Sequence, residues 1–151
     1  MSNRLLHDVD LDGSRHTRAG GVTASYRWLA AAREVRGLLH FGADAEGLPG
    51  HVHGGALSAA VDEAMGMACW CEGYCAPGVR VAAEFLLPLR PGATALLTAR
   101  LLRAEGRKLH CSAEIWHAEN AAVRATGLFV AVPLVDPAPF AGWPGLERFL
   151  P

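Results

Sequence analysis

The sequence predicts an α+β domain in which an antiparallel sheet packs against one long, mostly apolar helix. Three observations lead to this prediction. One short apolar run precedes a stretch with helical periodicity, four strand-like runs follow it, and the segments between those runs are short enough for antiparallel neighbours. The chain has 151 residues, the length of one average domain. A helix that is apolar on nearly every side must be covered on several sides, so the sheet curls around it or a partner subunit covers it.

The first half of the chain predicts an arm, a strand, a loop and the helix. Residues 1–33 show little periodicity and predict an irregular N-terminal arm, with a short helix at Ala24–Ala32. The apolar run Glu34–Phe41 predicts a strand, and the Gly, Asp and Pro of Gly42–Gly50 predict a loop. Small and apolar residues then recur at spacings of three and four without a proline, which predicts a helix at about Gly54–Trp70.

The second half predicts a run of strands and a tail. Apolar and polar residues alternate most clearly around Leu109, Cys111, Ala113 and Ile115, which predicts a strand with one buried apolar face. Five prolines from Pro133 to Pro151 predict a tail that wraps the surface. The predicted strands are Val79–Leu87, Thr94–Leu102, Lys108–His117 and Val123–Val132.

Composition and charge exclude several classes of protein. The chain is 51% hydrophobic and 19% charged, which is unlike a disordered protein. Its net charge of −1 and its lack of a basic block argue against nucleic acid or an anionic membrane as partner. No apolar stretch approaches the length of a membrane span, and the opening residues lack the apolar region of a signal peptide. We therefore expect a cytoplasmic protein.

The four cysteines do not form a recognisable metal or disulfide pattern. Cys69, Cys71 and Cys75 lie close together, and thiolates bind zinc tightly, but no second pair with zinc-site spacing follows. A chain without an export signal has no expected disulfide framework. We interpret the cysteines, including Cys111, as small buried thiols and expect no metal site.

The segment Glu46–Gly66 holds the pattern that indicates chemistry. Its loop runs directly into the predicted helix, with His53-Gly54-Gly55 at the junction. The first turn of a helix presents free backbone N–H groups and the positive end of the helix dipole. Glycines there allow close approach to the backbone, so the junction suits a bound anion or a developing oxyanion. The alternative is a tight turn packed on the sheet, with no ligand.

Asp62 and Glu63 are acidic residues inside an otherwise apolar helix. Neighbouring helix positions differ by about 100° in direction, so we expect only one of the two to face solvent. Asp62 shares a face with small residues, where a slender ligand or another chain can approach. It lies about 12 Å along the helix from Gly54, at the far side of a ligand whose carbonyl sits on the helix N-terminus. The alternative is an aspartate that pairs with an arginine or caps a neighbouring segment.

The pattern of His53-Gly54-Gly55, six residues and then Asp62, preceded by EGLPG and followed by Gly66, resembles the hotdog-fold acyl-CoA thioesterases. It is most similar to the PaaI-like group of the 4-hydroxybenzoyl-CoA thioesterase superfamily. The similarity extends over residues 34–133, flanked by the arm at 1–33 and a Pro-rich tail at 134–151. It implies a hotdog fold, in which a curved antiparallel sheet of five to six strands wraps one long central helix at about Gly54–Trp70.

The same resemblance implies a function and roles for individual residues. The Gly54 N–H polarises a thioester carbonyl, His53 and Gly55 shape the same turn, and Asp62 from the opposite subunit acts as general base or nucleophile. These roles fit thioester hydrolysis, which needs an oxyanion donor and an activated water. The implied partners are an acyl-CoA substrate and a second copy of the chain, as a homodimer or dimer of dimers with the active site at the interface. No metal or other cofactor is implied.

Three further residues are candidates for substrate binding. Trp70 and Phe85 are expected to line the acyl pocket, because of their distance from the motif. Arg80 is a candidate ligand for a CoA phosphate, with a solvated strand residue as the alternative. We expect Asp62→Ala to abolish turnover and Glu63→Ala to have a far smaller effect.

Two departures from the family keep other functions open. Several relatives carry Asn or Gln shortly before the histidine, where this chain has Gly47, Leu48 and His51, and many carry Ser or Thr near the second strand, where it reads Gly78-Val79-Arg80-Val81. A non-catalytic acyl-CoA-binding or regulatory module therefore remains an alternative, as does an acyl-carrier-protein thioesterase. Hotdog dehydratases and hydratases use a different His and acidic arrangement, so the HGG-x6-D spacing argues against them.

Overall fold

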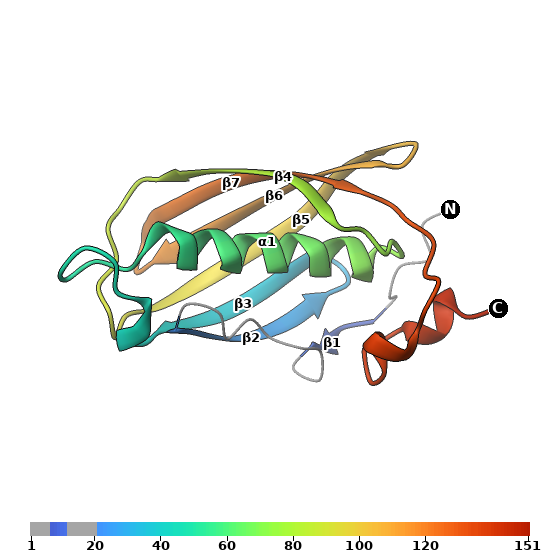
Figure 1. The fold of residues 1–151 in the computed structure, drawn as a ribbon, viewed down its shortest axis with the longest axis horizontal. Helices are drawn as coiled ribbons and strands as arrows, with labels where there is room; N and C mark the ends of the chain where they lie inside the picture. Colours follow the sequence, from blue (N-terminus) through green and yellow to red (C-terminus); the bar gives the residue numbers. More distant parts are fainter. Residues whose placement is uncertain (1–6, 12–20) are drawn as a thin grey trace.

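The computed structural model describes residues 7–11 and 21–151. One long helix, α1 (Gly54–Cys71), lies in the hollow of a curved antiparallel sheet (Figure 1). This arrangement confirms the predicted hotdog fold, and the helix ends within one residue of its predicted end. The strands are β1 (Val9–Asp10), β2 (Val22–Leu29), β3 (Glu34–Phe41), β4 (Gly78–Phe85), β5 (Thr94–Glu105), β6 (Lys108–His117) and β7 (Asn120–Val130).

The sheet has seven strands in the described residues, in the order β1-β2-β3-β5-β6-β7-β4. The prediction of five to six strands was therefore too low. Every neighbouring pair is antiparallel. The strand that directly follows the helix, β4, forms one edge of the sheet and pairs only with β7 among the described strands. Its outward backbone groups are therefore available to another strand.

The strand β2 corrects the prediction of an irregular arm with a short helix at Ala24–Ala32. This segment pairs with β3 along its whole length, from Val22 opposite Phe41 to Leu29 opposite Glu34. Its even-numbered positions turn toward the helix, and Tyr26 and Trp28 are fully buried. The sheet therefore begins before Glu34, while residues 1–6 and 12–20 of the predicted arm lie outside the described residues.

Small side chains let α1 lie close to the sheet. Ala60, Ala64 and Ala68 are buried along one face of the helix, and the sheet covers them with larger side chains such as Leu97 and Ile115. Alanine has the highest helix propensity, so the residues that permit close packing also favour the helix itself. No helix in the described residues is long and apolar enough to cross a membrane.

The Pro-rich tail returns to the C-terminal end of α1 (Figure 1). It contains two short 3-10 helices, η3 (Ala138–Phe140) and η4 (Leu146–Phe149). Its aromatic side chains pack against the main core, so the tail is a packed part of the domain surface. The short 3-10 helix η2 (Ala43–Ala45) lies at the opposite end, in the loop that leads to α1.

Candidate active site

The loop before α1 fixes the His-Gly-Gly turn through one side-chain hydrogen bond. His53 is the N-cap of the helix, and its Nδ1 accepts a hydrogen bond of 2.7 Å from the Gly55 N–H. In the neutral ring the accepting nitrogen carries no proton, so the proton lies on Nε2. Gly47 lies directly against His53, since a Cβ at Gly47 would stand 3.0 Å from the His53 Cδ2.

Gly54 is the first residue of α1, and its N–H has no hydrogen-bond acceptor in the described part of the chain. The Phe85 ring at the end of β4 lies over it, because a Cβ at Gly54 would meet the Phe85 Cζ at 3.3 Å. Since Gly55 already donates to His53, Gly54 offers the remaining backbone donor of this turn for a ligand oxygen.

Asp62 is exposed on the open face of α1, and none of the ion pairs among the described residues involves it. Partial burial among apolar neighbours nonetheless raises the pKa of its carboxyl above the ordinary value. The start of β4 comes very close, because a Cβ at Gly78 would stand 3.0 Å from the Asp62 Oδ1. The glycine therefore leaves room for the carboxylate, and the alternative of an Asp62–Arg pair is not observed among these residues.

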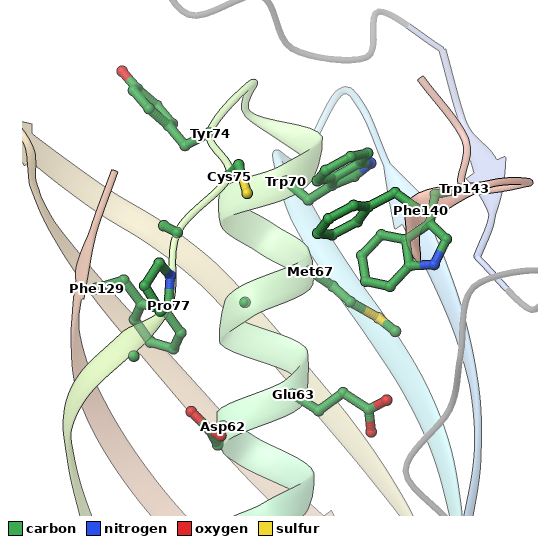
Figure 2. A pocket seen from close by; sticks show the side chains of 13 residues that line it. Asp62, Glu63, Met67, Trp70, Tyr74, Cys75, Pro77, Phe129, Phe140 and Trp143 are labelled. Atoms are coloured by element: carbon green, nitrogen blue, oxygen red, sulfur yellow. The ribbon is translucent and has the colours of Figure 1, made fainter. Parts of the chain in front are cut away.

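Glu63, the neighbouring acid, is held by the sheet. Tyr26 of β2 donates a hydrogen bond of 3.4 Å to the Glu63 Oε2. Burial and the nearby Glu63 carboxylate raise the pKa of Tyr26, so its hydroxyl stays protonated and remains a donor. Figure 2 shows the Asp62 and Glu63 side chains leaving the helix in different directions, in keeping with the roughly 100° between neighbouring positions.

Two hollows meet at Asp62. The first, which we call the α1 groove, has a volume of about 390 Å³ and follows the exposed face of α1 from Asp62 to Trp70 (Figure 2). The second, the edge groove, has a volume of about 480 Å³ and lies between α1 and β4. The α1 groove is mainly apolar, with walls from Met67, Trp70, Tyr74, Cys75, Pro77, Phe129, Phe140 and Trp143. The edge groove is lined by Ser58, Ala59 and Asp62 of α1 and by Gly78, Val79, Arg80, Val81, Ala83 and Phe85 of β4.

The two parts of the predicted catalytic machinery are separated within one chain. Asp62 lies eight residues after Gly54 on the same straight helix, so about 12 Å separates them along the axis. A single thioester carbonyl cannot contact the Gly54 N–H while its carbon lies within reach of water held by Asp62 of the same chain.

The structure distributes the predicted substrate-binding residues between the two grooves. Trp70 lies in the α1 groove, whereas Arg80 and Phe85 lie in the edge groove. Sequence reasoning missed the groove walls from Phe129 of β7 and from the tail. The concentration of aromatic residues in a short Pro-rich tail was the available signal.

The cysteines contribute packing and one wall. Cys69, Cys71 and Cys111 are buried, and the Sγ atoms of Cys69 and Cys111 lie 3.4 Å apart within hydrogen-bonding distance. Cys75 is partly exposed and lines the α1 groove. Within residues 7–11 and 21–151, no three His, Cys, Asp or Glu side chains are grouped to hold a metal ion.

A central helix wrapped by one antiparallel sheet defines a hotdog protein, and the carboxylate midway along the helix and the glycine turn at its start form its candidate site. The family model of the thioesterase superfamily matches residues 49–123, about half of the chain and the region of that site. The chain belongs to the thioesterase superfamily, as the resemblance in its sequence indicated.

Individual relatives agree with this assignment. The acyl-coenzyme A thioesterase THEM4 of Rattus norvegicus is 28% identical over 102 residues, which cover 66% of this chain and 44% of the rat protein. A solved thioesterase superfamily protein superposes with a TM-score of 0.68 at 27% identity, covering 80% of this chain and 64% of its own. This chain therefore spans less than two thirds of the length of either relative.

A third relative shares the fold at lower identity. A hypothetical thioesterase from Streptococcus pneumoniae, solved with coenzyme A, superposes with a TM-score of 0.63 at 13% identity, covering 66% of this chain and 78% of its own. At this identity the likeness concerns the fold.

Proposed function

We propose that this protein hydrolyses acyl-CoA thioesters and that Asp62 activates the attacking water. The observation that carries the proposal is an Asp62 carboxylate without an ion-pair partner among the described residues, placed where two grooves meet, with its pKa raised by burial. A general base is more effective when its pKa lies nearer to the working pH. Superfamily membership and a rat acyl-CoA thioesterase among the relatives support a thioester as the substrate.

The proposed reaction uses one carboxylate and one backbone donor. Water attacks the thioester carbonyl carbon while Asp62 accepts its proton, and negative charge develops on the carbonyl oxygen. The Gly54 N–H and the α1 dipole stabilise that oxyanion. When the intermediate collapses, the C–S bond breaks, and the proton on Asp62 passes to the departing CoA sulfur. Direct attack by Asp62 on the carbonyl is the alternative. It releases CoA thiolate and forms an anhydride between Asp62 and the acyl group, and water that attacks the Asp62 carbonyl of this anhydride leaves ¹⁸O in the Asp62 carboxyl after a single turnover in ¹⁸O-water.

We further propose that each active site combines two subunits of a homodimer. The separation between Gly54 and Asp62 along one helix requires the donor and the base to come from different chains. The edge strand β4 supports this arrangement, because its backbone is available for pairing and Val79 and Phe85 are 57% and 53% exposed. A two-fold axis near β4 would bring the start of one α1 toward the Asp62 of its partner.

The edge groove provides a place for the CoA portion. Arg80 lies there beside Asp62 and is the only cation among the residues that line this groove. A guanidinium is well suited to bind a phosphate. If Arg80 binds a CoA phosphate, its replacement should raise the KM for acyl-CoA. If Arg80 is only a solvent-exposed strand residue, its replacement should leave that KM unchanged.

A thiol-release assay tests the proposal. The purified protein is given acyl-CoAs from acetyl to palmitoyl, together with benzoyl- and phenylacetyl-CoA, and Asp62→Ala is measured in parallel. Turnover that disappears in Asp62→Ala supports the proposal, provided that Glu63→Gln, a matched change one residue away, loses far less. Equal losses in the two variants, or full activity in Asp62→Ala, would overturn the role of Asp62.

The same panel separates the other functions. Binding of acyl-CoA without turnover would favour the non-catalytic binding or regulatory module. Turnover of acyl-carrier-protein thioesters alone would retain the chemistry but change the carrier.

A further inference from the structure

The C-terminal tail is anchored to the end of α1 by directed hydrogen bonds. The Trp70 indole Nε1 donates a hydrogen bond of 2.8 Å to the Pro144 carbonyl. The Arg148 guanidinium donates to the carbonyls of Trp70 at 2.9 Å and Cys71 at 3.3 Å in the last turn of α1, where the Trp70 carbonyl also accepts from the Gly73 N–H. A cation at this position also interacts favourably with the helix dipole. The tail is therefore fixed in place.

Four aromatic rings, Trp70, Phe140, Trp143 and Phe149, form what we call the tail cluster. Trp70 is stacked between Phe140, with ring centroids 5.2 Å apart, and Phe149, at 4.4 Å. Trp143 packs edge-on against both Trp70 and Phe140, with centroids 5.1 Å apart in each case. These contacts join the four rings into one continuous apolar wall.

This wall lies at the end of the α1 groove opposite Asp62. Figure 2 shows Trp70, Phe140 and Trp143 on the far side of Met67 from the two carboxylates. Phe149 does not line the groove and instead stacks on the Trp70 ring. Phe140, Trp143 and Phe149 lie beyond residue 123, where the superfamily match ends, whereas Trp70 lies within it.

We propose that the tail cluster ends the acyl-binding groove and restricts the substrates to apolar acyl groups of medium length. This inference rests on the proposed function, since it places the thioester carbon at Asp62. The groove follows α1 from Asp62 to Trp70, eight residues or about 12 Å. With carbon–carbon bonds of about 1.5 Å, an extended chain advances by about 1.25 Å per carbon, so about eight to ten carbons reach the wall. A palmitoyl chain is too long to lie extended in the groove.

Non-hydrolysable S-alkyl-CoA thioethers test the proposal independently of catalysis. Their affinities for the wild-type protein are measured by calorimetry for chains of 4 to 16 carbons. We expect affinity to rise by about fourfold per methylene while the chain extends along the groove. The rise should stop at about eight to ten carbons, where the chain meets Trp143 and Phe140. We call the chain length at which the affinity stops rising the break.

Three variants locate the wall. Trp143→Ala should move the break to chains longer by two carbons or more, whereas Trp143→Phe keeps a ring there and should leave the break close to the wild-type position. Trp116→Ala is the matched control, because Trp116 lies on β6 outside the groove and bonds to Glu114. An unchanged break in folded Trp143→Ala, an equal shift in Trp116→Ala, or no break in the wild type would overturn the proposal.

The proposal and the enzymatic function fail separately. A break that moves in Trp143→Ala, in a protein that hydrolyses no thioester, would support the groove and overturn the activity. Hydrolysis that depends on Asp62, with a break that does not move in Trp143→Ala, would support the activity and overturn the tail cluster as the end of the acyl groove.

Discussion

Replacing Gly54 by proline should remove the proposed oxyanion donor and leave the fold intact. Gly54 is the first residue of α1, the position that accommodates proline best, because the N–H there makes no helical hydrogen bond. The preceding residue, His53, has φ −64° and ψ 135°, an extended conformation that is compatible with a following proline. The substitution therefore deletes one N–H group at little cost to the helix.

The expected loss follows from the number of donors removed. Deleting one oxyanion-hole donor typically lowers kcat by about 10² to 10³, or about 2.7–4 kcal/mol of transition-state stabilisation. Gly54→Ala is the matched control, because it adds the same Cβ at 3.3 Å from the Phe85 ring but keeps the N–H. The measurement is kcat from thiol release, with thermal melting to establish folding. Equal kcat values in Gly54→Pro and Gly54→Ala would refute the role of this N–H.

Three further predictions concern pH and stability. Burial raises the pKa of Asp62, so kcat should fall as the pH decreases. The pH at which kcat is half-maximal should lie above the ordinary aspartate pKa of about 3.9. A raised carboxyl pKa also means that ionisation disfavours the folded state. Relative to Asp62→Asn, the wild type should therefore lose thermal stability as the pH rises from the ordinary to the raised pKa, and parallel melting curves across this range would contradict the desolvation of Asp62. At Gly37, an added Cβ would lie 2.7 Å from the Tyr26 Cε1, so Gly37→Ala should lower the free energy of unfolding by about 1–3 kcal/mol in urea titrations. An unchanged urea midpoint would show that the Tyr26 ring can move aside.

The central helix was predicted closely from the sequence, whereas the strand β2 was missed although its pattern was present. The regular spacing of small apolar residues, without a proline, set α1 to within one residue of its observed end. In β2 the buried Val22, Tyr26 and Trp28 alternate with polar residues on the other face, which is the pattern of a half-buried strand and the signal that the prediction of an irregular arm missed. Pairing with β3 along the whole segment agrees with the strand preference of its Val, Thr, Tyr and Trp residues.

The candidate site was predictable where its residues lie in one continuous segment. His53, Gly54 and Asp62 share a loop and a helix, so their spacing in the sequence gives their spacing in space. The far wall of the α1 groove joins Trp70 to Phe140 and Trp143 of the tail, and no periodicity connects residues so far apart in the chain. Only the return of the tail onto the end of α1 brings them together.

Mixed dimers of two inactive variants test most directly whether the active site is shared between subunits. Asp62→Ala lacks the base and Gly54→Pro lacks the donor, so each homodimer should have little or no activity. In a dimer with one chain of each kind, one site carries both defects and the other carries neither. If random exchange makes half of the dimers mixed, activity should recover to about a quarter of the wild-type value. No recovery in proven mixed dimers, alongside an active wild type, would contradict a site built from Asp62 of one subunit and Gly54 of the other.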